Sequence, residues 1–166
     1  MSWLTVEKAK EFHRRHPGLS FPVDMERLAE AEGCELVDWP LLEPYTEVKR
    51  DQWIGLARGL SRAERRHLIA HALAHHLMHS GNQVSLYERD KVIVSQQERQ
   101  AEECAAHILM PEEELQRVGN MPVWELAEYF GVPEELARQR VSEFATDKEL
   151  ARRQAAVKTT SQVRVI

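Results

Sequence analysis

Residues 67–79 read HLIAHALAHHLMH, so that His67, His71, His75 and His79 follow one another at intervals of four. Residues four apart in an α-helix project from nearly the same face, and the segment therefore predicts one helix with a row of histidines. Two imidazoles one turn apart can bind one tetrahedral metal ion. The spacing alone leaves a solvated helix face open as well, because the chain has eight histidines in 166 residues.

The sequence before the histidine row predicts a mainly helical α+β domain. Ser61, with Glu64 three residues later, forms a capping box that begins the histidine helix. The expected elements upstream are helices over residues 5–16 and 24–33, strands over residues 34–39 and 52–60, and a loop over residues 40–52.

The sequence after the row predicts further helices and one weakly patterned segment. Residues 82–95 hold short β-prone pieces and are expected to form a strand or a loop at the edge of a cleft. A helix over residues 96–110 ends before Pro111. The remaining elements are helical pieces over residues 112–118, 122–130 and 133–144, the last two resembling a helix-turn-helix pair, and a polar, partly mobile tail from Thr146.

Length and composition limit the class of protein. The chain is 43% hydrophobic and long enough for one core, so we expect a single domain over residues 1–145, with residues 122–145 as a helical appendage packed on it and residues 146–166 as a partly basic tail. The net charge of -5 argues against wholesale binding to nucleic acid or anionic membranes. Two separated cysteines and the lack of an apolar run of about 18 residues predict a cytoplasmic protein without membrane contact.

A third ligand for a metal ion is expected on the following helix. Residues 98–111 read ERQAEECAAHILMP and place Glu98 and Glu102 one turn apart, while Ala101 and Ala105 allow that helix to pack closely on a neighbour. A carboxylate can reach a metal ion held by another helix only when the two helices approach closely. Read alone, the two glutamates are also compatible with a solvated stripe.

Four segments follow one another in a specific order: WIGLARGLS, RRHLIAHALAHHLMH, ERQAEECAAHILMP and VWELAEYFGVPEELARQRV. Together they resemble the ImmA/IrrE family of zinc metallopeptidases. In that family the first helix reads roughly R-R-F-x-x-A-H-E-x-x-H-x-x-x-H, and the next carries a glutamate ahead of an A-A-x-L-L-M-P-like ending. The chain then continues into L-A-x-x-F-G-V. FPVDMERLAEAEGCELV also resembles the family's opening helix and strand, so the resemblance covers about residues 19–145.

The resemblance implies a zincin-like fold and a set of site residues. By position, His71 and His75 become the two histidine ligands of one Zn²⁺ ion, and Glu98 becomes the carboxylate ligand. Glu102 matches a polar position that could orient a ligand histidine. His79 matches a histidine often present one turn later, to which we assign no role.

Members of the family are cytoplasmic endopeptidases that cleave helix-turn-helix repressors, often encoded beside them, and so switch on stress or mobile-element genes. The resemblance therefore implies a protein substrate whose cleavage relieves repression. His67, His76 and His107 have no counterpart in the motif, and we interpret them as packing or surface residues.

The chain departs from the family at Ala72, where the motif has glutamate. In the zinc-peptidase mechanism that glutamate takes a proton from the metal-bound water and passes it to the leaving amine, and alanine can do neither. We expect zinc binding to survive and proteolysis to be nearly lost. We favour a deliberate glutamate-to-alanine change, because all three ligands remain. The alternative is a natural pseudopeptidase that binds a repressor without cleaving it.

A DNA-binding regulator is the other alternative. In that interpretation residues 133–144 would lie in the major groove. They carry Glu134, Glu135 and Glu143 against Arg138 and Arg140, which is a poor face for a groove lined with phosphates. We expect this helix to pack against the core instead, although scattered basic residues in the tail leave a weak nucleic-acid contact open.

Overall fold

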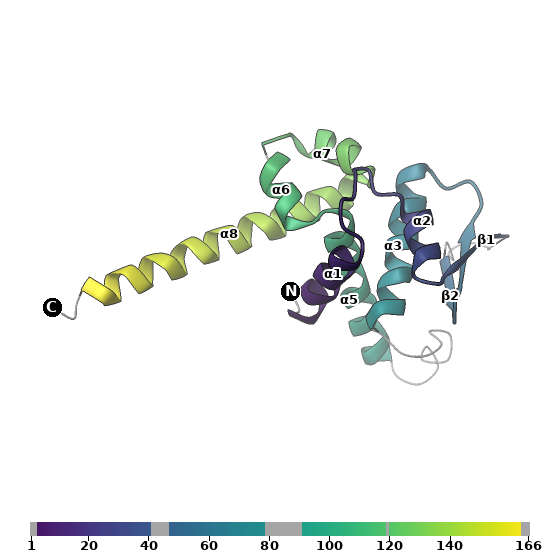
Figure 1. The fold of residues 1–166 in the computed structure, drawn as a ribbon, viewed down its shortest axis with the longest axis horizontal. Coiled ribbons are helices and arrows are strands. Elements are labelled where there is room, and N and C mark those ends of the chain that lie inside the picture. Colours follow the sequence, from purple (N-terminus) through teal and green to yellow (C-terminus); the bar gives the residue numbers. More distant parts are fainter. Residues whose placement is uncertain (1–2, 41–46, 79–90, 119, 164–166) are drawn as a thin grey trace.

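The computed structural model describes residues 3–40, 47–78, 91–118 and 120–163. It confirms the mainly helical α+β fold (Figure 1). The elements are the helices α1 (Trp3–Arg15), α2 (Met25–Ala31), α3 (Arg62–Met78), α5 (Lys91–Leu109), α6 (Glu112–Val118), α7 (Val123–Phe130) and α8 (Glu134–Val163), and the strands β1 (Glu35–Trp39), β2 (Glu47–Arg50) and β3 (Trp53–Ala57).

The elements form layers that begin at the small sheet. The sheet contacts α2 and α3, α3 packs on α5, and α5 packs on α1. The histidine helix therefore lies in the interior, between the sheet and a second long helix. Such stacking buries one stripe of each helix against the next layer.

The sheet has the order β1-β3-β2, with β1 parallel and β2 antiparallel to β3. The prediction that residues 40–52 form only a loop was wrong for β2. Residues 51 and 52 separate β2 from β3, and Asp51 takes a positive φ of 51° in this short connection. Glu47 and Lys49 share one face of β2, so the strand lacks the apolar alternation by which sequence reasoning recognises strands.

The predicted helix starts are confirmed by their caps. The backbone N–H of Glu64 donates to Ser61 Oγ at 3.2 Å, and the Glu64 carboxylate accepts from the Ser61 N–H at 2.8 Å. Asp24 accepts from the N–H of Arg27 at 3.2 Å at the start of α2. Each cap satisfies a backbone donor that the first turn of a helix leaves free.

Two helices extend beyond their predicted ends. The interpretation of residues 82–95 as a strand or loop was wrong for residues 91–95, which belong to α5, and its earlier part lies outside the described residues. A short β-branched run is a weak preference that a continuing helix overrides. The backbone of α8 runs to Val163, through most of the expected tail, because no glycine or proline follows Pro133.

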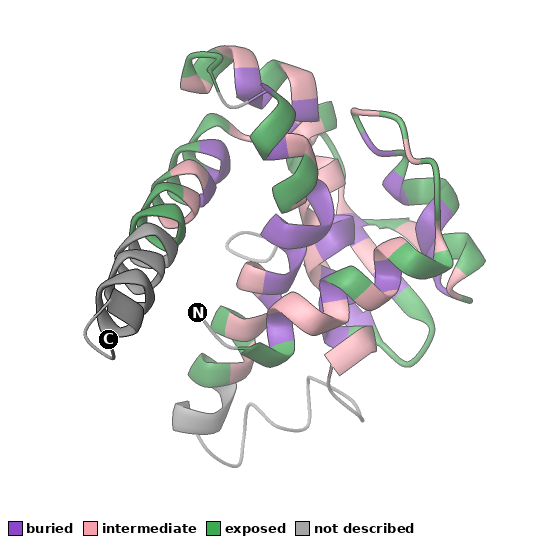
Figure 2. Cartoon of the chain, turned by 60° about the vertical axis from the view of Figure 1, so that its left-hand side comes forward, coloured by how far each residue is buried: buried purple, intermediate pink, exposed green. Residues whose placement is uncertain are grey.

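The core lies between the helices, where Figure 2 shows the buried positions gathered. The small-residue face predicted for α5 is fully buried, and so are large side chains from several other elements. Each such large apolar side chain contributes about 1.5–3 kcal/mol to folding. The fully buried large apolar side chains include Phe12, Ile54, Leu56, Ile69, Leu73, Ile108, Leu109 and Phe130. Among the described helices, none has both the length and the apolar character needed to cross a bilayer.

Gly131 ends α7 in the left-handed conformation, and its substitution should be costly. A Cβ there would lie 2.4 Å from an Arg66 nitrogen and 2.8 Å from Pro22 Cβ, so Gly131→Ala adds a clash to backbone strain. We expect it to lower the free energy of unfolding by about 3 kcal/mol. Gly59→Ala is the matched control, because Gly59 also has positive φ but open space around it. It should cost about 1–2 kcal/mol. Equal losses in urea unfolding would contradict the clash.

Candidate metal centre

Three side chains from two helices converge between α3 and α5. His71 and His75 come from α3 and Glu98 comes from α5, and one ligand atom from each lies within 4.8 Å of the other two. Nε2 of His71 is 3.4 Å from Glu98 Oε2, and Nε2 of His75 is 3.3 Å from Glu98 Oε1. Two imidazole nitrogens and a carboxylate oxygen are a donor set that fits one tetrahedral divalent ion with a fourth position open.

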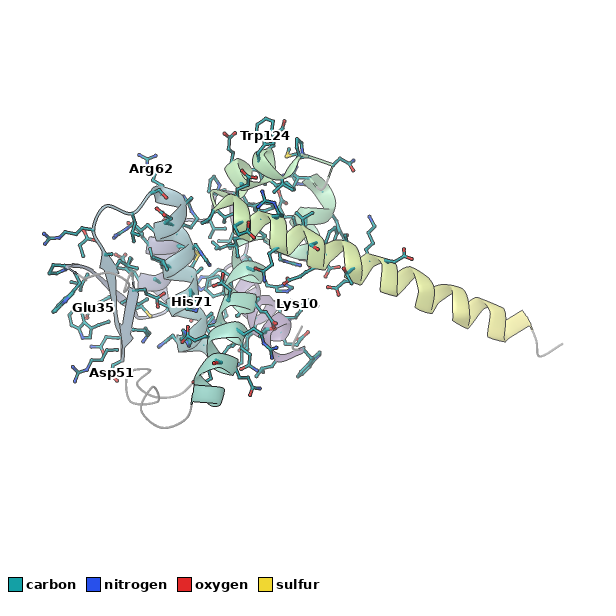
Figure 3. The ribbon with its side chains drawn as sticks, turned by 180° about the vertical axis from the view of Figure 1, so that it is seen from behind. Lys10, Glu35, Asp51, Arg62, His71 and Trp124 are labelled. Carbon is teal, nitrogen blue, oxygen red and sulfur yellow. The ribbon has the colours of Figure 1, made fainter. Side chains whose placement is uncertain are left out.

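Burial is uneven across this cluster. Side-chain exposure rises from 3% at His75 through 16% at His71 to 49% at Glu98. Figure 3 shows His71 between the sheet on the left and the long helix α5 to its right. A ligand such as water or a peptide carbonyl would therefore approach from the Glu98 side, while the two imidazoles are held by packing.

A second carboxylate, that of Glu47 on β2, contacts the other ring nitrogen of His71. It accepts a hydrogen bond from Nδ1 of His71 at 2.9 Å, and its side chain is 11% exposed. Metal-binding histidines commonly donate their second ring N–H to a carboxylate, which fixes the tautomer and the ring orientation. Sequence reasoning missed Glu47 because it fell in the predicted loop. A hairpin reading of residues 47–57 would have placed it opposite Leu56, on the face toward α3.

The carboxylates around His71 control its protonation. Burial alone would lower the pKa of His71, but the hydrogen bond and charge of Glu47, with the charges of Glu102 and Glu98, raise it to about 9. In the metal-free chain His71 therefore carries a proton at neutral pH. A cation of higher charge would compensate the same carboxylates, which makes the cluster suited to a divalent metal.

Comparison with known proteins identifies the family. A family model described as Peptidase_M78, the IrrE N-terminal-like domain, matches residues 29–142, a range that contains Glu47 and the whole three-residue cluster. The chain belongs to the IrrE N-terminal-like family. This membership supports a domain of the metallopeptidase type.

A solved structure supports the fold of this IrrE-like domain. It is described as a Mycobacterium tuberculosis transcriptional regulator, with a TM-score of 0.61 and 17% sequence identity. The match covers 82% of this chain and 46% of that chain, so the present chain spans less than half of the regulator's length. No protein among those with curated descriptions matches the chain.

Glu102, predicted to orient a ligand histidine, has its closest ion-pair contact with His67. Glu102 Oε1 is 2.9 Å from Nε2 of His67, which lies one turn before His71 on α3. Burial would raise the pKa of Glu102, but the adjacent His67, with the charge of His71, lowers it. Glu102 is thus an ionised carboxylate near the cluster, and Glu47 is the residue that contacts His71 Nδ1.

The other residues singled out in the sequence differ in how far they are buried. Ala72 is fully buried on α3 between the two histidines of the cluster. His76 is exposed, whereas His107 is buried on α5. His79 lies outside the described residues.

The two cysteines are free and buried. Burial raises the pKa of the Cys104 thiol to about 12, and burial is also the main reason that the pKa of Cys34 is raised. Neither thiol is therefore a ready thiolate, and neither belongs to the metal cluster.

Proposed function

We propose that the chain binds one zinc ion through His71, His75 and Glu98, and that its natural form is a cytoplasmic endopeptidase. The observation that carries this proposal is the convergence of these three side chains within 4.8 Å in a chain of the IrrE N-terminal-like family. Two imidazoles, one carboxylate and an open position are the ligand pattern of catalytic zinc. The proposed substrate is a helix-turn-helix repressor encoded nearby.

Each residue of the proposed site has a definable task. When bound, the zinc ion would polarise the scissile carbonyl and lower the pKa of a coordinated water. His71 and His75 hold their nitrogens in place through packing on α3, and Glu47 accepts the hydrogen bond from His71 Nδ1–H, so that Nε2 is the nitrogen that would give up its proton and bind metal. A general base belongs at position 72, where Ala72 has no group that can accept a proton.

We further propose that position 72 is glutamate in the natural protein and that alanine was introduced to stop self-cleavage or to trap a substrate. An otherwise complete ligand set, with Glu47 in contact with His71, supports this view. The alternative is a natural zinc-binding pseudopeptidase that holds a repressor without cutting it. The sequence of the native gene distinguishes the two, since any residue other than glutamate at position 72 contradicts the first.

The contacts of α8 weigh against the DNA-binding alternative. Arg138 forms ion pairs with Glu134 and Glu135. Arg140 is buried and its Nε donates to the Met110 carbonyl at 3.3 Å. Both arginines of the proposed recognition helix are therefore engaged within the domain, and the exposed face keeps its glutamates.

The test of the proposal combines metal analysis with repressor binding. The purified chain should contain about one zinc per molecule and should bind the repressor encoded beside its gene without cutting it. Absence of zinc at saturating supply would contradict both the peptidase and the pseudopeptidase. Binding of operator DNA by the chain, in place of repressor, would favour the regulator.

Removing the Glu47 carboxylate should weaken zinc binding. We expect Glu47→Leu to lower the zinc affinity about 10- to 100-fold, because His71 loses the group that orients its ring. Competition with a chromophoric chelator measures this affinity. Glu35→Leu is the matched control, since Glu35 is an exposed carboxylate on β1. Equal affinities of the two variants would show that Glu47 does not support the site.

A further inference from the structure

A second concave site lies apart from the metal cluster. A cavity of about 300 Å³ is bounded by α1 on one side and by the end of α5 and the start of α6 on the other. None of its lining residues belongs to the metal cluster. Figure 3 shows Lys10, one of the lining residues, on a different part of the molecule from His71. The volume is at the lower end of the range for small-molecule sites.

The walls of this cavity carry opposite charges. Lys10 and Arg14 lie one turn apart on α1, while Glu112 and Glu113 begin α6. Among the residues that the structure describes, no ion pair joins the α1 wall to the α6 wall, and Lys10 has only a 3.8 Å contact with Glu7. Two basic and two acidic side chains therefore line one cavity without a direct ion pair between them, and Glu112 accepts a hydrogen bond from Gln116 at 3.2 Å on its own helix.

His107 lines the same cavity and has an unsatisfied ring nitrogen. Its side chain is 7% exposed, and its Nε2 is buried without a hydrogen-bond partner among the described residues. A buried polar group left without a partner costs about 1–3 kcal/mol. Burial, with the charges of Arg140, Lys10 and His13, lowers the pKa of His107 to about 3. The imidazole is therefore neutral at physiological pH, with one ring nitrogen that donates and one that accepts.

His13, the other histidine that lines the cavity, does not hydrogen-bond the side chain of His107. Nε2 of His13 is 3.3 Å from the main-chain carbonyl of His107, so this nitrogen donates to the backbone. The His107 Nε2 therefore keeps no hydrogen-bond partner among the described residues. Val6 and Ala9 give the remaining wall an apolar surface that could accommodate aliphatic atoms.

We propose that this cavity binds a small zwitterion of the free α-amino acid class with a polar side chain. The carboxylate would lie at Lys10 and Arg14, the ammonium at Glu112 and Glu113, and the polar side chain would hydrogen-bond His107. A simple anion would be repelled by the two glutamates, and a simple cation by the two basic residues. Only a molecule that carries both charges complements both walls.

Calorimetric titration of the full chain tests this proposal with L-glutamine, L-asparagine and L-serine. At least one should bind with a Kd below about 1 mM. Succinate and putrescine, which carry one sign of charge, should bind at least about tenfold more weakly. No binding by any of the three amino acids up to about 10 mM would overturn the proposal, and so would equal binding of the single-sign controls.

Variants locate the binding. Arg14→Gln should weaken it about tenfold or more, whereas Arg15→Gln should leave it unchanged, because Arg15 pairs with Glu32 and does not line the cavity. His107→Phe, which keeps a ring without the nitrogens, should also weaken it. Binding must persist in His75→Ala, which separates this site from zinc chelation by the amino acid. An unchanged Kd in Arg14→Gln, or loss of binding in His75→Ala, would overturn the proposal.

Discussion

Ala72→Glu should raise the rate of repressor cleavage about 10²- to 10⁴-fold over the chain with alanine. This is the usual contribution of a positioned general acid–base group. Ala72 lies on α3 between the two histidines of the cluster, so a carboxylate there would stand at the position where the family motif has its general base. The measurement is the initial rate of cleavage of the neighbouring repressor by zinc-loaded protein, followed by the loss of intact substrate on a gel.

Comparing Ala72→Glu with Ala72→Gln tests whether the carboxylate itself is responsible for the cleavage. Ala72→Gln has nearly the shape of glutamate but no basic carboxylate, so it should stay near the alanine background. Because Ala72 is fully buried, both longer side chains must find room, and equal zinc content with equal circular dichroism shows that they do. A well-folded, zinc-loaded Ala72→Glu protein that still fails to cleave, with any activating signal supplied, would favour the pseudopeptidase.

His75→Ala should lower the zinc affinity by more than about 100-fold. Loss of a residue that merely orients a ligand costs 10- to 100-fold, and loss of the ligand itself should exceed this. His75 is the most buried of the three proposed ligands and its Nε2 lies 3.3 Å from Glu98, so a water molecule would be a poor substitute for its imidazole. Chelator competition at fixed pH gives the affinity.

His76→Ala is the matched control for this substitution. His76 is the next residue on α3, has the same chemistry and is exposed. Its removal should leave zinc affinity within about twofold, since isolated surface substitutions rarely change more than about 0.5 kcal/mol. If both variants keep zinc equally well, the ligand set is wrong. If both lose it, α3 is being destabilised as a whole.

The sequence predicted the helical part of the fold well because its signals are local. The Ser61–Glu64 capping box and the apolar periodicity of α3 and α5 depend on residues within one or two turns of each other. β2 could not be predicted in the same way. Its inward residues Glu47 and Lys49 are charged, and only pairing with β3 makes them a strand.

The three residues of the metal cluster were predicted from the sequence, but the residues that contact them were not. The spacing of His71 and His75 indicated a possible metal pair, and the resemblance to the ImmA/IrrE family supplied Glu98. The structure places all three together. It also brings Glu47 of β2 into contact with His71 of α3. This contact depends on the packing of the sheet on the helix and leaves no spacing pattern in the sequence. The partner of Glu102 is His67, which no motif indicated.

The position of Glu98 on a different helix from His71 has a consequence for stability. A metal ion bound by both would close a loop from residue 71 to residue 98, as a disulfide does in secreted domains, in a chain whose two cysteines are free. The chain-entropy relation for a loop of this length gives about 3.5 kcal/mol. Each tenfold rise in free metal above its dissociation constant adds about 1.4 kcal/mol. The free energy of unfolding of the domain would then follow the metal supply of its surroundings.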